Sequence, residues 1–177
     1  MVREIEMKAW LRRPDEALPR IRTLCAPLGE HVKEDIYFRP PGGGRNIRLR
    51  RQDGRWVCTR KTRNLRDGLE VNDETEFEVS DGTAMAELLE DLGCRVCLRK
   101  TKTGSAFRRG DLTVEVSRVP PLGSFVEVEC LLSEPRPGDE AAAEEKIRGF
   151  LADIGVREGE IEPRSYTQML LQAGEAR

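Results

Sequence analysis

The amino-acid sequence predicts an α+β fold in which antiparallel strands close into a β-barrel and helices flank its outer surface. Most of the expected strands carry long ionisable side chains at alternate positions, with apolar side chains between them. The expected helices have strong apolar stripes, which need a surface to cover. Ionisable side chains of both signs recur along the strands, so charges gathered inside a barrel could compensate one another.

A sheet with its charged face in solvent is the alternative arrangement. For a single Glu-x-Glu or Arg-x-Arg pattern taken alone, it is also the commoner one. The recurrence of the pattern in most of the strands favours the barrel, whose lumen would hold the charges while the helices cover its apolar outer face.

Length and composition predict one domain. A chain of 177 residues, 38% of them hydrophobic, can form its own core, and we expect residues 1–177 to be a single domain. No apolar run approaches the length of a membrane span. The N-terminus is charged from Arg3 onward and lacks the apolar stretch of a secretory signal. We therefore expect a cytoplasmic protein that makes no contact with membranes.

The first expected strand, at residues 4–8, carries its charges as a row. Its charged positions Glu4, Glu6 and Lys8 alternate with Ile5, Met7 and Ala9. Asp15 can then cap a helix that Gly29 ends. The apolar stripe of this helix consists of Leu18, Ile21, Cys25 and Leu28.

An extended segment, a loop and a hairpin follow the first helix. Residues 35–39 are expected to be extended, and the glycine-rich residues 40–46 to form a flexible loop. A hairpin then spans residues 47–61, with Arg48 and Arg50 on one face of its first strand and Lys61 near its end.

A second row of carboxylates comes after an expected loop at residues 63–72. Glu74, Glu76 and Glu78 share one face of a strand. Asp81 can cap a short helix that Gly93 ends. The apolar stripe of this helix consists of Met85, Leu88, Leu89 and Leu92.

Three more strands and two helices complete the chain. The strands carry, in order, the pairs Lys100 and Lys102, Glu115 and Ser117, and Glu127 and Glu129. A helix from Asp139 to Gly155 points Ala143, Ile147, Phe150, Leu151 and Ile154 inward. Ser165 can cap a final helix that contains Met169 and Leu170.

The cysteines and the histidine offer little chemistry. Of five cysteines only Cys94 and Cys97 have a pairing-like spacing, and without a second Cys-x-x-Cys a zinc or redox site is disfavoured against buried thiols. The single histidine, His31, is expected in a solvated loop or helix end, which disfavours a serine triad. Lys33 and Lys146 are expected at the surface.

A lumen lined by ions is expected to hold a ligand, because buried charges without partners are costly. Clustered glutamates without histidine or thiolate suit a hard divalent ion such as Mg²⁺ or Mn²⁺. Clustered lysines and arginines suit phosphate oxygens. Together they predict a metal-complexed polyphosphate. The GGG at residues 42–44 lacks the lysine and helix of a P-loop, and no Rossmann glycine motif is present.

An ordered set of motifs resembles the CYTH domain, a family that includes class IV adenylyl cyclases and thiamine triphosphatases and is also called the triphosphate tunnel metalloenzymes. The motifs are E-x-E-x-K at 4–8, R-x-R at 48–50, a strand ending in Lys61, E-x-E-x-E at 74–78, Lys100 with Lys102, and L-G-x-F-x-E-x-E at 122–129. D-I-Y-F at 35–38 and E-P-R-S-Y-x-Q-x-L at 162–170 are similar to segments of the class IV cyclase-like (CyaB-type) branch. The resemblance spans nearly the whole chain.

The resemblance implies an eight-stranded antiparallel barrel, open as a tunnel, that binds a triphosphate with Mg²⁺ or Mn²⁺. It implies metal coordination by Glu4, Glu6, Glu127 and Glu129, and phosphate binding by Lys8, Arg48, Arg50, Lys61, Lys100 and Lys102, with Arg108 or Arg109 as a further candidate. The candidate catalytic residues are Glu4, Glu6 and Lys8, whereas Glu74, Glu76 and Glu78 could reach the metal or orient the basic residues.

One position departs from the family's pattern. Where the family has an acidic residue before the L-G-x-F segment, this chain has Ser117, and a hydroxyl is a weaker ligand for a hard cation than a carboxylate. Glu115 lies two residues earlier on the same face and is a candidate metal ligand in its place.

Two reactions fit such a tunnel. Water attacking the terminal phosphorus of tripolyphosphate, ATP or thiamine triphosphate would make the protein a triphosphatase, whereas the ribose 3′-hydroxyl of ATP attacking the α-phosphorus would yield cyclic AMP and pyrophosphate. We expect hydrolysis, because cyclisation also requires a pocket for adenine and ribose. A non-catalytic polyphosphate or nucleotide sensor is a third alternative.

The charge balance and the family suggest which macromolecules the protein meets. With 30 basic and 32 acidic residues, the near-neutral net charge argues against binding to nucleic acid. A homodimer is expected by analogy with the family.

Overall fold

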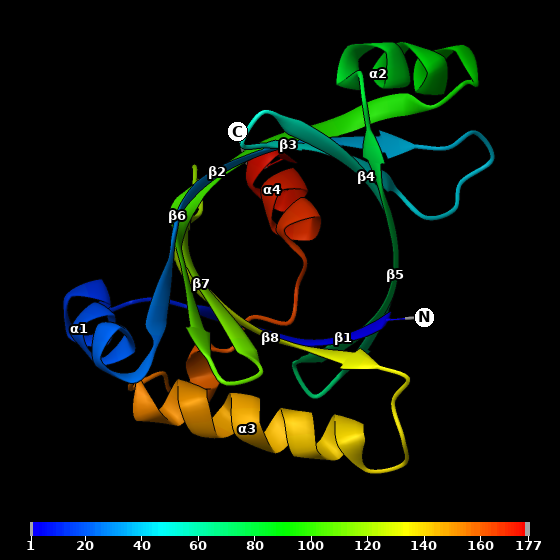
Figure 1. Ribbon diagram of the computed structural model, residues 1–177. Coiled ribbons are helices and arrows are strands. Elements are labelled where there is room, and N and C mark those ends of the chain that lie inside the picture. Colours follow the sequence, from blue (N-terminus) through cyan, green and yellow to red (C-terminus); the bar gives the residue numbers. More distant parts are fainter. Residues whose placement is uncertain (1, 176–177) are drawn as a thin grey trace.

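The computed structural model describes residues 2–175, within which eight antiparallel strands close into a barrel (Figure 1). Hydrogen-bonded neighbours follow the order β1-β5-β4-β3-β2-β6-β7-β8. The strands are β1 (Val2–Trp10), β2 (Ala26–Arg39), β3 (Ile47–Gln52), β4 (Arg55–Arg66), β5 (Leu69–Val79), β6 (Arg95–Arg109), β7 (Leu112–Val119) and β8 (Gly123–Ser133). The predicted α+β barrel with flanking helices is confirmed.

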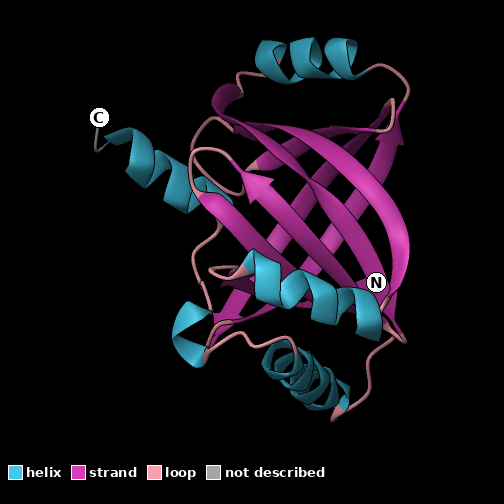
Figure 2. Ribbon diagram, turned by 90° about the vertical axis from the view of Figure 1, so that its left-hand side faces the viewer, coloured by secondary structure: helices cyan, strands magenta, loops and turns pink. Residues whose placement is uncertain are grey.

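Helices flank the barrel on several sides (Figure 2). They are α1 (Pro14–Leu24), α2 (Gly82–Asp91), α3 (Asp139–Asp153) and α4 (Tyr166–Glu175), with a short 3₁₀ helix at Glu158–Glu160. Helix α3 lies against β1 and β8, α1 against β2 and β6, and α2 against β3 and β6. Helix α4 is placed differently: in the view down the barrel it overlaps the opening of the ring of strands (Figure 1), and Figure 2 shows that it projects from one end of the barrel. None of the helices in residues 2–175 is long and apolar enough to cross a membrane.

The main apolar core lies between the outer face of the barrel and the helices. Ile5 and Met7 of β1, together with Val128 of β8, are fully buried there. They belong to the same cluster as Ile21 of α1 and Ile147 of α3. Burial of one such side chain contributes about 1.5–3 kcal/mol, so the helices hold the barrel closed by covering its apolar face.

The charged side chains occupy the opposite face because side chains alternate along a strand. On β1, Glu6 is paired in register with Glu129 of β8, and Lys8 is paired with Glu127. Closure of the sheet then points these rows toward the barrel axis.

A second, smaller apolar cluster brings α4 to the barrel. Tyr166 and Met169 of α4 pack with Val119 of β7 and Phe125 of β8. The ring of Phe125 lies edge-on to Tyr166, with 5.1 Å between the ring centroids. Ser165 caps α4 as predicted, because its hydroxyl accepts a hydrogen bond of 3.2 Å from the backbone N–H of Gln168.

Two predicted segments are wrong. The first helix ends at Leu24, and residues 26–34, which include the predicted end at Gly29, belong to strand β2. The predicted loop at residues 63–72 is instead the end of β4, a tight turn and the start of β5. That turn has Asp67 and Gly68 at φ of 49° and 81°, the conformation of a two-residue hairpin turn.

The stripe predicted for α2 is only partly buried. Asp81 caps this helix by accepting hydrogen bonds from the N–H groups of Thr83 and Ala84. Leu89 is buried, but Leu88 and Leu92 are exposed. The five cysteines are free thiols, four of them buried, in agreement with the buried-thiol interpretation.

Candidate functional site

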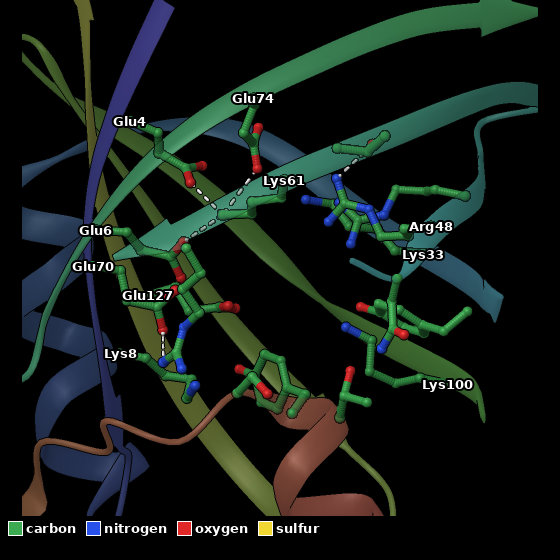
Figure 3. Close-up of a pocket in the computed structure, with 18 of the residues that line it drawn as sticks. Glu4, Glu6, Lys8, Lys33, Arg48, Lys61, Glu70, Glu74, Lys100 and Glu127 are labelled. Atoms are coloured by element: carbon green, nitrogen blue, oxygen red, sulfur yellow. Dashed lines mark hydrogen bonds and ion pairs between the residues drawn. The ribbon is translucent and has the colours of Figure 1, made fainter. Parts of the chain in front are cut away.

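The barrel encloses a cavity of about 960 Å³ that side chains from all eight strands and from α4 line. Its walls carry carboxylates and cations together, and Figure 3 shows several of them pointing toward one another. The structure brings eleven of the predicted site residues to this cavity: Glu4, Glu6, Lys8, Arg48, Arg50, Lys61, Lys100, Lys102, Glu115, Glu127 and Glu129.

Lys61 of β4 joins carboxylates from two other strands (Figure 3). Its ammonium group forms ion pairs with Glu4, with Glu6 at 3.5 Å and with Glu74 at 2.9 Å. Asn72 of β5 donates a second hydrogen bond to Glu4, of 2.9 Å. Burial alone would lower the pKa of Lys61, but Glu6, Glu4 and Glu74 outweigh it and raise this pKa, so Lys61 stays charged.

Lys102 of β6 joins the carboxylates of β7 and β8. Its ammonium group pairs with Glu127 and, at 2.7 Å, with Glu115. Lys33 of β2 also donates a hydrogen bond to Glu115. Although burial opposes ionisation, Lys102 and Lys33 hold the pKa of Glu115 at about 2, so this carboxylate is charged at neutral pH.

Two further carboxylates are crowded by like charges. Burial, followed by the charges of Glu4 and Glu115, raises the pKa of Glu129 to about 7. Burial also raises the pKa of Glu6 well above its usual range, and the opposing charge of Lys61 does not outweigh it, because Glu4 adds a further rise. The acidic part of the cavity therefore holds more carboxyl groups than its lysines keep ionised, and a bound cation would favour their ionised forms.

The donor chemistry of this acidic part fits Mg²⁺ or Mn²⁺. The converging groups are carboxylate oxygens, which hard divalent ions prefer. Among residues 2–175, however, no group of three or more Asp, Glu, His or Cys side chains is arranged to hold a metal ion. The lysine contacts explain this arrangement, because Lys61 and Lys102 lie between the carboxylates that a divalent ion would bring together.

The opposite side of the cavity is rich in cations. Arg48 donates hydrogen bonds to Glu76 at 3.0 Å and to Thr59 at 2.9 Å. Arg50 and Lys100 both contact Asp35, which lies behind them in β2. These guanidinium and ammonium groups have the chemistry that binds phosphate oxygens.

The segment that leads into α4 contacts cations from both sides of the cavity. Lys8 donates a hydrogen bond to the carbonyl oxygen of Arg164, and Arg63 donates one to the carbonyl oxygen of Pro163. The ring of Tyr166 then lies 4.6 Å from the ammonium groups of both Lys8 and Lys100, within range of a cation–π interaction.

Three of the residues predicted for the site do not line the cavity. Arg108 is exposed and does not line it, and Arg109 instead contacts Asp153 at 2.8 Å on the outside. Glu78 is exposed and pairs with Arg55 at 3.6 Å, whereas Glu74 and Glu76 of the same row do line the cavity.

His31 and Lys33 are not surface residues, and both predictions are wrong. They lie on the inner face of β2 and are buried. His31 Nε2 lies 3.2 Å from the hydroxyl of Ser117, which is also buried. Ser117 therefore has a histidine partner, while Glu115 supplies the carboxylate of β7 to the charged cluster.

Sequence reasoning also missed Asp35, Arg63, Glu70 and Tyr166. Arg63 pairs with Glu70 at 2.5 Å, and both continue the alternation of Lys61 and Glu74 beyond the expected strand ends. If β4 and β5 are given their observed ends, the same alternation places Arg63 and Glu70 on the inner face. Asp35 was hidden because the outer face of β2 is also charged, as at Glu34, so no apolar alternation marks its inner face.

Comparisons with known proteins agree with this geometry. The family model of the CYTH domain matches residues 2–166. The "Putative adenylate cyclase MJ0240" of Methanocaldococcus jannaschii is 22% identical over 174 residues, covering 94% of this chain and 97% of that protein.

Solved structures share the barrel. The PH1819 protein of Pyrococcus horikoshii OT3 has a TM-score of 0.82 at 27% identity, covering 96% of this chain and 99% of its own. A Hippeastrum protein, HpAC1, has a TM-score of 0.70 at 17% identity, covering 98% of this chain and 96% of its own. Its structure is described as that of a "putative adenylyl cyclase" with a dominant triphosphatase activity.

Proposed function

The chain belongs to the CYTH domain family, and on that premise we propose that it is a divalent-metal-dependent enzyme that hydrolyses a phosphoanhydride bond of a triphosphate bound in the barrel. One observation carries the proposal: the cavity of the barrel holds carboxyl groups in excess of their cations on one side and lysines and arginines on the other. That division matches the two components of a metal-complexed triphosphate.

The cationic wall would bind the phosphate chain. Lys100 and Arg48 of this wall, and Lys8 from β1 on the acidic side, present N–H groups to the cavity, and such donors stabilise negative charge on a transferring phosphoryl group. Glu4, Glu6, Glu115, Glu127 and Glu129 would hold the divalent ion. A bound Mg²⁺ or Mn²⁺ would neutralise phosphate charge and polarise the phosphoryl group. Water would attack the terminal phosphorus while the bond to the bridging oxygen breaks, giving orthophosphate and a diphosphate.

Cyclisation of ATP is the second candidate, and the neutral part of the cavity lining favours it. Asn46, Val57, Thr167, Gln168 and Leu171 line the same cavity and could contact a nucleoside. Hydrolysis requires no such contact, so we place it first. A sensor without catalysis is less well supported, because Glu115 supplies a carboxylate in spite of Ser117.

A substrate panel tests the proposal. Tripolyphosphate, ATP and thiamine triphosphate are each incubated with Mg²⁺, Mn²⁺ or EDTA, and orthophosphate, pyrophosphate and cyclic AMP are quantified. We expect metal-dependent release of orthophosphate. Cyclic AMP with equimolar pyrophosphate would identify the protein as a cyclase instead, and tight binding without any product would identify a sensor.

A further inference from the structure

The most enclosed ion cluster of the barrel wall centres on Asp35 of β2. Its carboxylate accepts hydrogen bonds from Arg50 Nε at 2.7 Å and from Arg50 Nη2 at 3.0 Å. The ammonium group of Lys100 lies 2.9 Å from the same carboxylate. The hydroxyl of Tyr37 is 3.4 Å away. The side chain of Asp35 is 0% exposed and that of Lys100 only 2%.

Strand register produces this cluster. Asp35 is the direct cross-strand partner of Arg50 on β3 and of Lys100 on β6, so one carboxylate lies between the two cations. Side chains of directly paired residues lie close enough to interact. The three residues therefore form one row across three neighbouring strands.

Asp35 lies behind its partners as seen from the cavity. Within residues 2–175, Arg50, Lys100 and Tyr37 line the cavity, whereas Asp35 does not. The glutamates that pair with Lys61 and Lys102 differ in this respect, because they face the cavity themselves. Asp35 is thus placed to hold cations without competing for a metal ion.

The hydrogen bonds to Asp35 leave donors for a ligand. They use Nε and Nη2 of the Arg50 guanidinium, so Nη1 is the nitrogen left for an anion. Lys100 forms an ion pair with Asp35, and its ammonium group has three N–H donors in all. A bidentate contact also fixes the plane of the guanidinium, which sets the direction of the free N–H groups.

Asp35 remains ionised across the physiological range. Although its burial opposes ionisation, Arg50 and Lys100 hold the pKa of Asp35 far below its usual value. Both contacts therefore persist whenever the protein is folded near neutral pH.

We propose that Asp35 is a positioning residue, which holds Arg50 and Lys100 on the cavity wall so that their remaining N–H groups meet the phosphate oxygens of a triphosphate. The inference rests on the proposed function, because it assumes that these two cations bind the substrate. A carboxylate behind a phosphate site repels the ligand, so its presence is explained by the geometry that it imposes on two donors.

The test compares Asp35→Asn with a matched control. Glu34→Gln removes the neighbouring carboxylate, which is exposed on the outer face and contacts Arg51 at 3.5 Å. For each protein, KM and kcat are measured with tripolyphosphate and Mg²⁺, well below the melting temperature of the variant. We expect Asp35→Asn to raise KM by about tenfold or more, with kcat changed by less than about threefold. Glu34→Gln is expected to match wild type.

A purely structural role would lower the melting temperature of Asp35→Asn and leave KM unchanged, which would overturn the inference. A lower KM would also overturn it, because Asp35 would then act only as a competitor of the phosphates. If the wild-type protein neither turns over nor binds tripolyphosphate, the proposed function fails together with the inference. Wild-type activity with unchanged KM in the variant removes the inference alone.

Asp35→Glu keeps the test decisive if Asp35→Asn does not fold. Its charge is conserved, but the longer side chain shifts the carboxylate toward the cavity and displaces the guanidinium. A positioning role predicts a KM about threefold or more above wild type. An unchanged KM would mean that only the charge matters, and would overturn the inference.

Discussion

At the scale of single residues, Lys61 is the cation around which Glu4, Glu6 and Glu74 gather. Lys61→Ala removes the cation that pairs with these carboxylates. Removing one partner of a buried ion pair destabilises a protein by about 3–5 kcal/mol. We expect a lower melting temperature in EDTA and a larger rise on adding Mg²⁺ than wild type shows. Tripolyphosphate binding should also weaken. Thermal melts and calorimetric titration measure the two effects.

Lys146→Ala is the matched control for that variant, because Lys146 is half-exposed and pairs with Asp111 at 2.5 Å on the outside of the barrel. Exposed ion pairs contribute about 0–1 kcal/mol, so its melting temperature and Mg²⁺ response should remain near wild type. A Mg²⁺ response of Lys61→Ala no larger than that of wild type would contradict the placement of a cation among these three carboxylates.

Glu4 provides the sharpest test of the metal site. Glu4→Gln preserves size and can still accept hydrogen bonds from Lys61 and Asn72, but it removes the charge that a divalent ion needs. We expect kcat/KM with Mg²⁺ and tripolyphosphate to fall by about 100-fold or more, with the circular dichroism spectrum unchanged. Glu78→Gln, in an exposed residue outside the cavity, should retain wild-type activity. Full activity of Glu4→Gln would exclude Glu4 as a metal ligand.

The cavity residues of β1 were predictable because they alternate with apolar residues on the outer face of the barrel. Glu4, Glu6 and Lys8 alternate with Ile5 and Met7, which are buried under helices, so the pattern is unambiguous. Asp35 and Lys33 have the charged Glu34 between them, so no alternation of polarity marks their inner face. The site roles themselves came from the resemblance and remain predictions.

At the scale of elements, the segment before α4 is held by Glu162, which accepts hydrogen bonds from Trp10 at 2.9 Å and from Arg164 Nε at 2.8 Å. Arg164, followed by Trp10, holds the pKa of Glu162 at about 2 in the folded protein, below the ordinary value of 4.5. A depressed pKa contributes stability above about pH 4.5, and this contribution is lost as pH falls toward about 2.

Glu162→Gln should therefore be less stable than wild type at neutral pH, and the difference should shrink as pH falls through that window. Denaturant unfolding at a series of pH values measures it. Glu158→Gln, which removes an exposed carboxylate near the same segment, should differ from wild type by only a small amount. A constant difference for Glu162→Gln would show that its ionised form makes no special contribution.

Element boundaries were harder to predict than element types. The hairpin at residues 47–61 is confirmed, because strand alternation and a glycine turn agree there. The spacing of Ile21, Cys25 and Leu28 predicts a helix that reaches Gly29, but in the structure residues 26–29 belong to β2, which pairs with β6, and Leu28 is exposed. Pairing with a neighbouring strand overrode a local periodicity that had no partner of its own.

At the scale of the whole molecule, the barrel has its charges inside and its main apolar core outside. Alternation along a strand is equally compatible with charges inside the barrel and with charges on its outer surface. The pattern of a single strand therefore does not distinguish the two arrangements. The helices decided, because α1 and α3 need an apolar surface and cover the outer face. The predicted fold is thereby confirmed, while the predicted homodimer and the chemistry of the tunnel await experiment.

Mg²⁺ and protons are expected to compete for the carboxyl groups of the cavity, and this competition should change the stability of the whole barrel. Burial, Glu4 and Glu115 raise the pKa of Glu129 from 4.5 to about 7 on folding. A raised pKa contributes stability below about pH 4.5 that is lost as pH rises through about 7, so without metal this group destabilises the barrel at pH 8. Mg²⁺ binds the ionised form, and we expect it to raise the melting temperature more at about pH 8 than at about pH 5.5.

Thermal melts with Mg²⁺ or EDTA at both pH values measure how much Mg²⁺ raises the melting temperature at each pH. Glu129→Gln tests whether ionisation of Glu129 causes the difference. Glutamine cannot ionise, so the variant should lose part of the pH dependence seen in EDTA and part of the Mg²⁺ response at about pH 8. Glu78→Gln, outside the cavity, should behave as wild type in both respects. A Mg²⁺ response of wild type that is equal at the two pH values would mean that the crowded carboxylates do not bind the ion, and the acidic side of the barrel would then need another explanation.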